Sequence, residues 1–278
     1  MCYITFLTTI KICEGYEFFL DRINLYILSI EKYCEKYQID YEILICEQVD
    51  EKNKFLIGDR LISKKNVRII ELSQTYPNPL GFNLIESYGK NACLREAKGI
   101  YCCMNSADQI FSEYFFLFIK EHLKLEHFYR FATYSTPQID VSELYEGDYH
   151  LKLESILENC YKNATGLCNK WCFEDNLTPF KIAQKSGDVM LMDTDSFRKI
   201  KGWPETICFT HMDCAVCLVA CNNFPAIVGP INACTYTMEQ PHRTPSNPRT
   251  LNVNGIDMDV GDFEWQVCLS YINRTECN

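Results

Sequence analysis

Apolar residues follow two alternating patterns in the first half of the chain. Short apolar runs, typical of buried parallel strands, alternate with longer segments in which apolar residues recur every three or four positions, as in helices. The predicted strands are 3–9, 41–47, 66–72, 100–104 and 128–134. The predicted helices are 17–37, 50–62, 83–98 and 112–126. Alternation of this kind predicts a parallel sheet with helices on both faces.

The second half is less regular. It predicts a helix and a long loop over 140–179, strands at 187–192, 226–228 and 234–238, helices at 193–200 and 210–221, and a loop after Pro241. In open parallel sheets, ligands bind beyond the carboxyl ends of the strands. The polar residues at or just after the ends of predicted strands in the first half are Thr8, Thr9, Glu47, Gln48, Asn105, Ser106 and Asp108.

Charge and composition narrow the range of partners. The chain has 278 residues, and 27 Lys and Arg against 37 Asp and Glu give a net charge of −10. This balance argues against a nucleic-acid partner, which requires a basic surface. With 47% hydrophobic and 23% charged residues, the sequence is that of a globular protein. No apolar run is long enough for a transmembrane helix, and the N-terminus lacks the features of a signal peptide.

The 17 cysteines indicate the cellular compartment. Many of them, such as Cys46, Cys102 and Cys103, lie inside apolar segments, where a thiol acts as a small buried hydrophobe. A chain of this length does not need a disulfide framework, so we expect reduced thiols in a cytoplasmic protein.

A second interpretation of the cysteines is a zinc site. Cys214, Cys217 and Cys221 fall on one predicted helix, and Cys168 and Cys172 lie in a loop, so that C-x-x-C and C-x-x-x-C spacings are both present. The helix trio is surrounded by apolar residues, however, and a buried apolar face explains it more simply.

The first segment with candidate chemistry runs from Lys90 to Gly99, through the second half of the helix predicted over 83–98. It places Asn91 and Arg95 on one face, and the following strand delivers Asn105 to Asp108 to its carboxyl end. A nucleoside diphosphate needs cations and a divalent metal held by oxygen ligands. The alternative is a capped helix followed by a core strand that ends in a polar turn.

Three further segments carry candidate chemistry. Gly187 would let a ligand approach the backbone, with Asp188 beside it as a hydroxyl acceptor, or both belong to a simple strand-turn-helix. Asp213 begins a helix, either as a general base or as a residue that stabilises the helix dipole. His242 is either a metal ligand or a solvent-exposed loop residue.

In their order and spacing, these segments resemble the GT-A-type nucleotide-sugar glycosyltransferases, especially the inverting family 2-like branch. The resemblance extends from Tyr3 to His242. It implies an α/β fold: a single GT-A (Rossmann-like) domain over 1–278, with a mostly parallel central sheet, helices on both faces and a small antiparallel C-terminal annex. Residues 1–135 would form the nucleotide-binding half and 136–278 the acceptor and catalytic half.

The resemblance also implies a reaction and its residues. A metal-dependent enzyme would move a sugar from a nucleoside-diphosphate donor, expected to be a UDP-sugar, to a hydroxyl of a glycan or protein acceptor with inversion. Asp213 would be the general base, and Asp108 and His242 would hold Mn²⁺ or Mg²⁺. The donor-binding residues would be Thr8, Thr9, Glu47, Lys90, Asn91, Arg95, Asn105, Ser106, Gly187 and Asp188.

The chain departs from the family pattern at the metal-binding positions. Ser106 stands where the family has the first Asp of its Asp-x-Asp turn, and Thr237 stands where some relatives have His. Asn105 offers an additional oxygen beside this turn. These departures keep open a second function, a degenerate member of the family that binds nucleotide or glycan without turnover.

A third class, the sugar-1-phosphate nucleotidyltransferases, shares the sheet architecture. It requires a Gly-rich phosphate loop directly after the first strand. The chain instead continues Thr8-Thr9-Ile10-Lys11-Ile12-Cys13, which disfavours that class.

Overall fold

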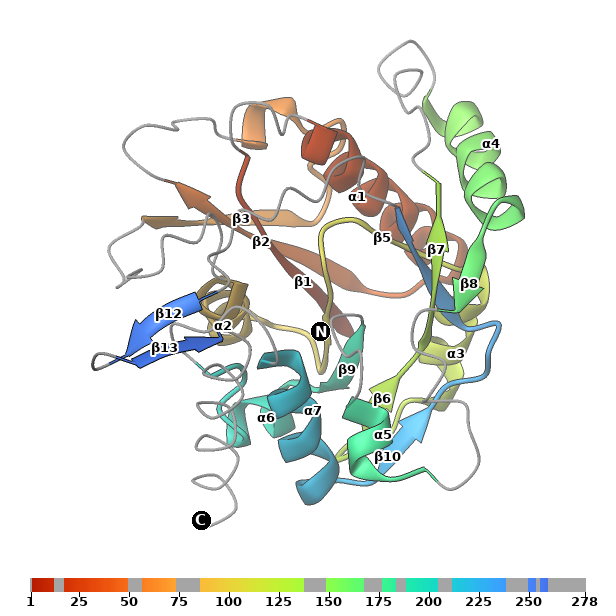
Figure 1. Ribbon diagram of the computed structural model, residues 1–278. Coiled ribbons are helices and arrows are strands. Elements are labelled where there is room, and N and C mark those ends of the chain that lie inside the picture. The colour runs from red at the N-terminus through yellow and green to blue at the C-terminus, as the bar shows by residue number, and fades with distance from the viewer. Residues whose placement is uncertain are drawn as a thin grey trace.

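The alternating strands and helices form a large, mostly parallel sheet covered on both faces (Figure 1). The structure is a computed structural model. It describes residues 2–12, 18–49, 57–73, 86–137, 149–167, 177–183, 189–204, 212–238, 250–253 and 256–259. None of the helices in these ranges is long and apolar enough to cross a membrane.

The large sheet has seven strands in the order β10-β6-β9-β4-β1-β2-β3. Their bounds are β1 Ile4–Ile10, β2 Tyr41–Val49, β3 Val67–Ser73, β4 Tyr101–Met104, β6 Phe128–Arg130, β9 Met190–Asp193 and β10 Ala226–Val228. β1 runs parallel to β2 and β4, whereas β9 runs antiparallel to both β4 and β6. Every residue of β1 is buried, as its continuous apolar run predicts.

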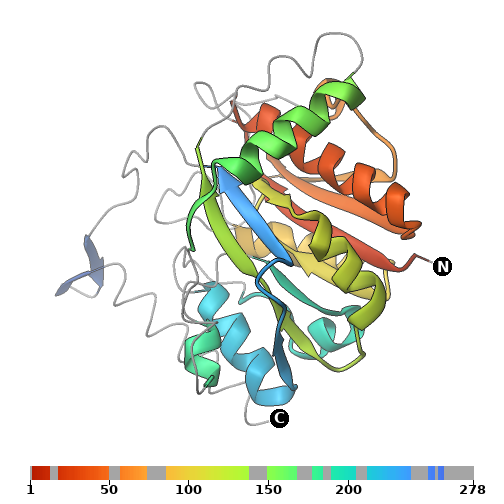
Figure 2. The same ribbon diagram turned by 90° about the vertical axis from the view of Figure 1, so that its right-hand side faces the viewer.

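Helices cover the two faces of this sheet (Figure 2). The helices are α1 Phe18–Tyr37, α2 Glu86–Glu96, α3 Glu113–His122, α4 Tyr149–Lys162, α5 Pro179–Ala183, α6 Thr194–Lys199 and α7 Met212–Asn223. Successive side chains of β1 alternate between two hydrophobic clusters. Ile4 and Phe6 join the cluster that includes residues of α1, α3 and α4, and Leu7 joins the one that includes residues of α2, α5, α6 and α7.

A smaller sheet and a hairpin complete the fold. The smaller sheet has the order β5-β11-β7-β8, and the hairpin pairs β12 with β13. Their bounds are β5 Gln109–Phe111, β7 Ala132–Thr136, β8 Thr165–Leu167, β11 Cys234–Met238, β12 Thr250–Val253 and β13 Ile256–Asp259. β11 is antiparallel to β5, which brings a late strand beside the turn that ends at Asp108. The predicted fold class, with an antiparallel pairing near the C-terminus, is confirmed.

Some elements differ from the sequence prediction. Of the helix predicted over 50–62, the described part holds only a 3₁₀ turn, η1 (Ile57–Arg60). The strand predicted over 128–134 is divided into β6 and β7 around the buried Phe131, where the chain passes from the large sheet to the small one. The tail after Pro241 contains the β12–β13 hairpin and is not a loop throughout.

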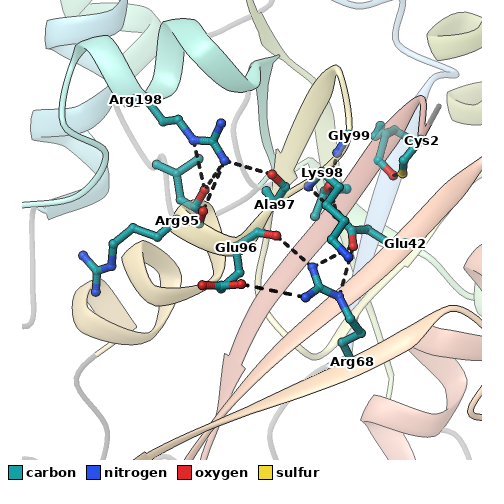
Figure 3. Close-up of polar contacts among 12 residues, drawn as sticks. Cys2, Glu42, Arg68, Arg95, Glu96, Ala97, Lys98, Gly99 and Arg198 are labelled. Carbon is teal, nitrogen blue, oxygen red and sulfur yellow. Dashed lines mark hydrogen bonds and ion pairs between the residues drawn. The ribbon is translucent and has the colours of Figure 1, made fainter.

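A polar network fixes the end of α2 against the amino ends of β1, β2 and β3 (Figure 3). The Glu42 carboxylate accepts hydrogen bonds from Thr5 Oγ1 at 2.7 Å, Lys98 N at 2.6 Å and Arg68 Nη2 at 2.9 Å. Burial raises the pKa of Glu42, but these donors outweigh burial and the net pKa lies below its ordinary value.

Arg198 of α6 binds the same turn from the other side (Figure 3). Its guanidinium donates to the carbonyl oxygens of Leu94, at 3.1 Å, and Ala97, at 2.8 Å. Leu94 lies in the last turn of α2 and Ala97 directly follows the helix, where carbonyl oxygens have no intrahelical partner. α2 is thereby held at its C-terminal end, which fixes the position of the residues near its start.

Candidate functional site

The carboxyl edge of the large sheet gathers several predicted donor-binding residues. Asn105, just after β4, donates its backbone N–H to Leu7 O of β1 at 3.2 Å, and Glu47 of β2 lies in register with Ile10 of β1. Thr8 is fully buried, and its Oγ1 has no hydrogen-bond partner among the described residues. The edge therefore contains polar groups from three neighbouring strands.

The first turns of α2 pack directly on the end of β1. Thr9 Oγ1 donates to Glu86 O at 3.4 Å. A Cβ atom on Gly89 would lie 2.4 Å from Thr9 Cγ2, so only glycine allows the helix to approach this closely. The next residue, Lys90, is consequently carried to the same edge.

Lys90 is a buried cation surrounded by carboxylates. It is 1% exposed, its Nζ lies 2.7 Å from Glu86 Oε2, and the same atom lies 4.7 Å from the centre of the Trp203 ring. Burial lowers the pKa of Lys90, but Glu86, Asp213 and Asp108 together outweigh it, so the net pKa is raised and Lys90 is charged at neutral pH. Asp213, the predicted general base, and Asp108, a predicted metal ligand, thus both lie within electrostatic reach of one ammonium group.

Trp203 connects α2 to α7. Its indole Nε1 donates to Asp213 Oδ1 at 3.1 Å. Its backbone N–H donates to Asn91 Oδ1 at 2.8 Å, and Asn91 Nδ2 donates to the Trp203 carbonyl oxygen at 2.8 Å. The preceding Lys201 and Gly202 have φ values of 65° and 63°, and a Cβ on Gly202 would meet Asn91 Oδ1 at 2.4 Å. Asn91 therefore positions the Trp203 turn.

Asp108 pairs with a residue that the sequence analysis missed. Arg22 of α1 places Nη1 3.4 Å from Asp108 Oδ2 and 3.3 Å from the carbonyl oxygen of Met238, at the end of β11. Arg22 is 2% exposed, and burial lowers its pKa, an effect that Asp108 partly offsets. One sequence signal was available, since Arg22 stands four residues before Tyr26 on the apolar stripe of the predicted helix.

The described donor atoms do not fit a site for Mn²⁺ or Mg²⁺. Within the described ranges, no three His, Cys, Asp or Glu residues are grouped as metal ligands would be. Asp108 supplies a carboxylate, but that carboxylate contacts a guanidinium. Ser106 and Thr237 offer hydroxyl groups where the resembled family has carboxylate and imidazole. His242, the second predicted ligand, lies outside the described residues.

Arg95 does not join the other predicted residues. It lies in the last turn of α2, nine residues beyond Glu86 and so roughly 13 Å along the helix axis from the sheet edge. It is exposed, and its carbonyl oxygen accepts a hydrogen bond from Arg198 at 3.3 Å (Figure 3). Gly187 and Asp188 lie outside the described residues.

Glu47 is a buried acid with an altered pKa. It is 1% exposed, and both of its carboxylate oxygens accept from the backbone N–H of Ile57, at 3.0 and 3.1 Å. Burial raises the pKa of Glu47 to about 7, with a smaller contribution from Glu71 of β3, although the Ile57 N–H acts in the opposite direction. This predicted donor-binding residue therefore has a pKa near neutral pH.

Eight of the eleven described cysteines are buried, whereas Cys2, Cys214 and Cys221 are half-buried. Cys217 is fully buried among apolar residues of α7, as the simpler interpretation predicts. None of the eleven described cysteines is in a disulfide. Cys168 and Cys172 lie outside the described residues.

Comparisons with known proteins give structural likenesses only. No family model matches the chain, and no curated protein matches it significantly. Among solved structures, the chain is similar to S. aureus TarS 1–349 in complex with UDP-GlcNAc, with a TM-score of 0.49, 12% identity, 87% of this chain covered and 60% of that one. It is also similar to the mannosyltransferase PcManGT from Pyrobaculum calidifontis in complex with GDP-Man and Mn²⁺, with a TM-score of 0.48, 10% identity, 86% of this chain covered and 57% of that one. The chain thus spans about three fifths of the length of these proteins, and its function is inferred from the site itself.

Proposed function

We propose that this chain is a GT-A-type glycosyltransferase that moves a sugar from a nucleoside-diphosphate sugar, most plausibly UDP-linked, to an acceptor hydroxyl with inversion. The observation that carries the proposal is that Lys90 and Asp213 both contact Trp203 at the carboxyl edge of the sheet, with Asp108 within electrostatic reach of Lys90. These residues come from the turn after β4, from α2 and from α7, and they meet where open α/β sheets bind ligands.

The polar strand ends would hold the nucleotide of the donor. Thr8, Thr9 and Glu47 line the ends of β1 and β2, and Asn105 and Ser106 follow β4. Gly187 and Asp188 remain predicted contacts of the donor sugar. Residues 1–135 would accordingly form the nucleotide-binding half of one domain, and 136–278 the acceptor and catalytic half.

Asp213 would act as the general base. Because Trp203 Nε1 binds Oδ1, the carboxylate is held in one orientation, and Oδ2 can take the proton of the acceptor hydroxyl. The hydroxyl oxygen attacks the anomeric carbon from the face opposite the phosphate. The bond from that carbon to the phosphate oxygen breaks, and its electron pair leaves with the nucleoside diphosphate, which the Lys90 ammonium stabilises electrostatically. The anomeric configuration is inverted.

The predicted metal ligands, Asp108 and His242, enter no step of this sequence. Dependence on Mn²⁺ or Mg²⁺ remains a prediction from the family resemblance. The pairing of Asp108 with Arg22 disfavours it.

A binding protein without turnover is the second candidate. Ser106 and the Arg22–Asp108 pair favour it, because both weaken a metal site of the family type. Asp213 opposes it, since its carboxylate lies half-buried at the site and is oriented by Trp203. The acceptor of the transferase would be a glycan or protein in the cytoplasm.

A donor screen tests the proposal. UDP-, GDP- and TDP-sugars, including UDP-GlcNAc and GDP-mannose, are added with and without MnCl₂, and the shift in Tm and the release of nucleoside diphosphate are measured. A bound donor raises Tm because it binds only the folded state. Binding with release of the diphosphate on addition of acceptor glycans supports the transferase. Binding without release across a broad acceptor panel supports the second candidate, and no shift with any donor refutes both.

A further inference from the structure

Arg22 is a buried cation beside the turn that follows β4. It is the fifth residue of α1, which follows β1, so it stands at the carboxyl edge of the sheet. The contacts of Nη1 with Asp108 Oδ2 and with the carbonyl oxygen of Met238 join α1, the turn after β4 and the end of β11. Burying an arginine is unfavourable unless its charge is compensated, so this placement requires a reason.

Lys90 is the second buried cation at the same edge. It approaches from α2, on the face of the sheet opposite α1, and it is also within electrostatic reach of Asp108. Two permanent positive charges therefore flank the turn that carries Asp108. A divalent cation in this place would have to compete with Arg22 for the only carboxylate between residues 105 and 108.

We propose that Arg22 and Lys90 supply the positive charge that a divalent metal supplies in the resembled family, so that the donor diphosphate binds without metal. This inference rests on the proposed function. Guanidinium and ammonium groups bind phosphate oxygens through charge-assisted hydrogen bonds. Unlike a metal ion, neither group has to be held in place by coordinating side chains. Asp108 then positions Arg22 and neutralises it when no donor is bound.

The two roles of Asp108 predict opposite effects of one substitution. If Asp108 is a metal ligand, Asp108→Asn weakens UDP binding in MnCl₂. If Asp108 restrains Arg22, Asp108→Asn releases the guanidinium charge, and UDP binds more tightly in EDTA, by roughly 2- to 10-fold. Isothermal titration of UDP into the intact chain, in EDTA and in MnCl₂, measures the difference.

The same titration on Arg22→Gln tests the cation itself. We expect the wild-type chain to bind UDP with equal Kd in EDTA and in MnCl₂. Arg22→Gln should raise the Kd in EDTA by roughly 10- to 100-fold, the loss expected for one hydrogen bond to a charged group. It also leaves Asp108 without its guanidinium, so that MnCl₂ should recover part of the affinity.

Two further variants keep the result interpretable. Arg22→Lys retains the charge in case the glutamine variant does not fold, and it should lose less affinity in EDTA than Arg22→Gln. Lys36→Gln removes another cation of α1 that is paired with a carboxylate, that of Glu113, near the opposite end of the helix, and should leave the Kd for UDP unchanged.

The outcomes separate this inference from the proposed function. UDP binding that requires MnCl₂ in the wild-type chain, or Asp108→Asn that abolishes binding, overturns the inference and leaves the transferase standing. No binding of UDP, GDP or TDP in either buffer overturns both.

Discussion

Trp203 contacts both charged groups on which sugar transfer would depend. Its ring faces the Lys90 ammonium at 4.7 Å, and its indole N–H holds Asp213 at 3.1 Å. A cation over an aromatic face retains part of the stabilisation that it loses on leaving water. The Trp203 side chain therefore sets the distance between the Lys90 ammonium and the Asp213 carboxylate. In the proposed reaction, the same distance separates the leaving diphosphate from the general base.

The first prediction concerns that base. Asp213→Asn keeps the oxygen that accepts the Trp203 hydrogen bond but cannot take a proton. We expect turnover to fall by about 10²- to 10⁴-fold, the usual loss for a general base, with donor affinity within a few-fold of the wild type. Steady-state kinetics and UDP titration measure the two effects. As a control, Asp195→Asn changes a carboxylate that is 86% exposed on α6 and should leave both values unchanged; turnover close to wild type in Asp213→Asn would disprove its role.

The second prediction concerns pH. Burial raises the pKa of Glu47 from its ordinary value of 4.5 to about 7, so the folded state binds this proton more tightly than the unfolded state. The free energy of unfolding should therefore decrease as pH rises from 4.5 to 7. Glu47→Gln removes the free-energy cost of ionising a buried carboxyl group. The variant should therefore be more stable than the wild type at pH 8, by at most about 3 kcal/mol.

Urea unfolding of both proteins at pH 4.5 and pH 8 measures that difference. Above pH 7 the advantage of Glu47→Gln should be complete, and at pH 4.5 it should be nearly absent. A constant difference between the two proteins across this range would show that Glu47 titrates normally in the folded chain.

At the scale of elements, α2 is fixed at both ends by contacts with different strands. Its first turns lie on the end of β1 through Gly89 and Thr9, and its last carbonyl oxygens bind Arg198. This double attachment matters because Lys90 projects from the first half of the helix. A shift of α2 would change the position of the Lys90 charge relative to the strand ends.

The third prediction tests the attachment to β1. Gly89→Ala would place Cβ 2.4 Å from Thr9 Cγ2 and 2.5 Å from Thr9 Oγ1. The helix must move away, so we expect a loss of roughly 1–3 kcal/mol in the free energy of unfolding, as for overpacked cores. Because Thr9→Ala removes both clashing atoms, the double variant should lose less stability than the sum of the single variants.

Urea denaturation of the four proteins gives the coupling energy. Gly58→Ala serves as a control, because its Cβ meets only the tip of Ile69, at 3.1 Å, which can move at small cost. Additive losses for Gly89→Ala and Thr9→Ala would mean that the helix does not depend on this contact.

At the scale of the whole molecule, the sequence predicts most strands of the large sheet but less of the antiparallel pairing and of the smaller sheet. The runs that form β1, β2, β3 and β4 are rich in apolar and β-branched residues, a local property, and their alternation with helices limits the possible topologies. The antiparallel insertion of β9 between β4 and β6 depends on long-range pairing, which no local pattern encodes. β5 is three residues long, too short for a periodic signal.

The sequence likewise predicts the location of some residues of the candidate site but not of others. Thr8, Thr9, Glu47 and Asn105 could be predicted because the ends of parallel strands meet at one edge. Arg22 was missed because its partner, Asp108, is 86 residues away in the sequence. Arg95 was predicted to bind phosphate with Lys90 and Asn91 but lies in the last turn of α2, since helical spacing gives the face of a helix but not which end lies at the sheet edge.

The last prediction concerns how stability is distributed over the fold. β1 pairs with β2 on one side and β4 on the other and is buried along its length, so its amides should exchange with solvent only through global unfolding. The β12–β13 hairpin pairs with no other strand in the described part of the chain (Figure 2), and an isolated two-stranded hairpin is marginally stable in water. Hydrogen exchange followed by mass spectrometry should therefore show fast exchange in peptides over 250–259 and the slowest exchange over 4–10, with the edge strand β10 between them. Equal protection of the hairpin and β1 would contradict this order, and it would mean that the tail is held by contacts as strong as those of the central sheet.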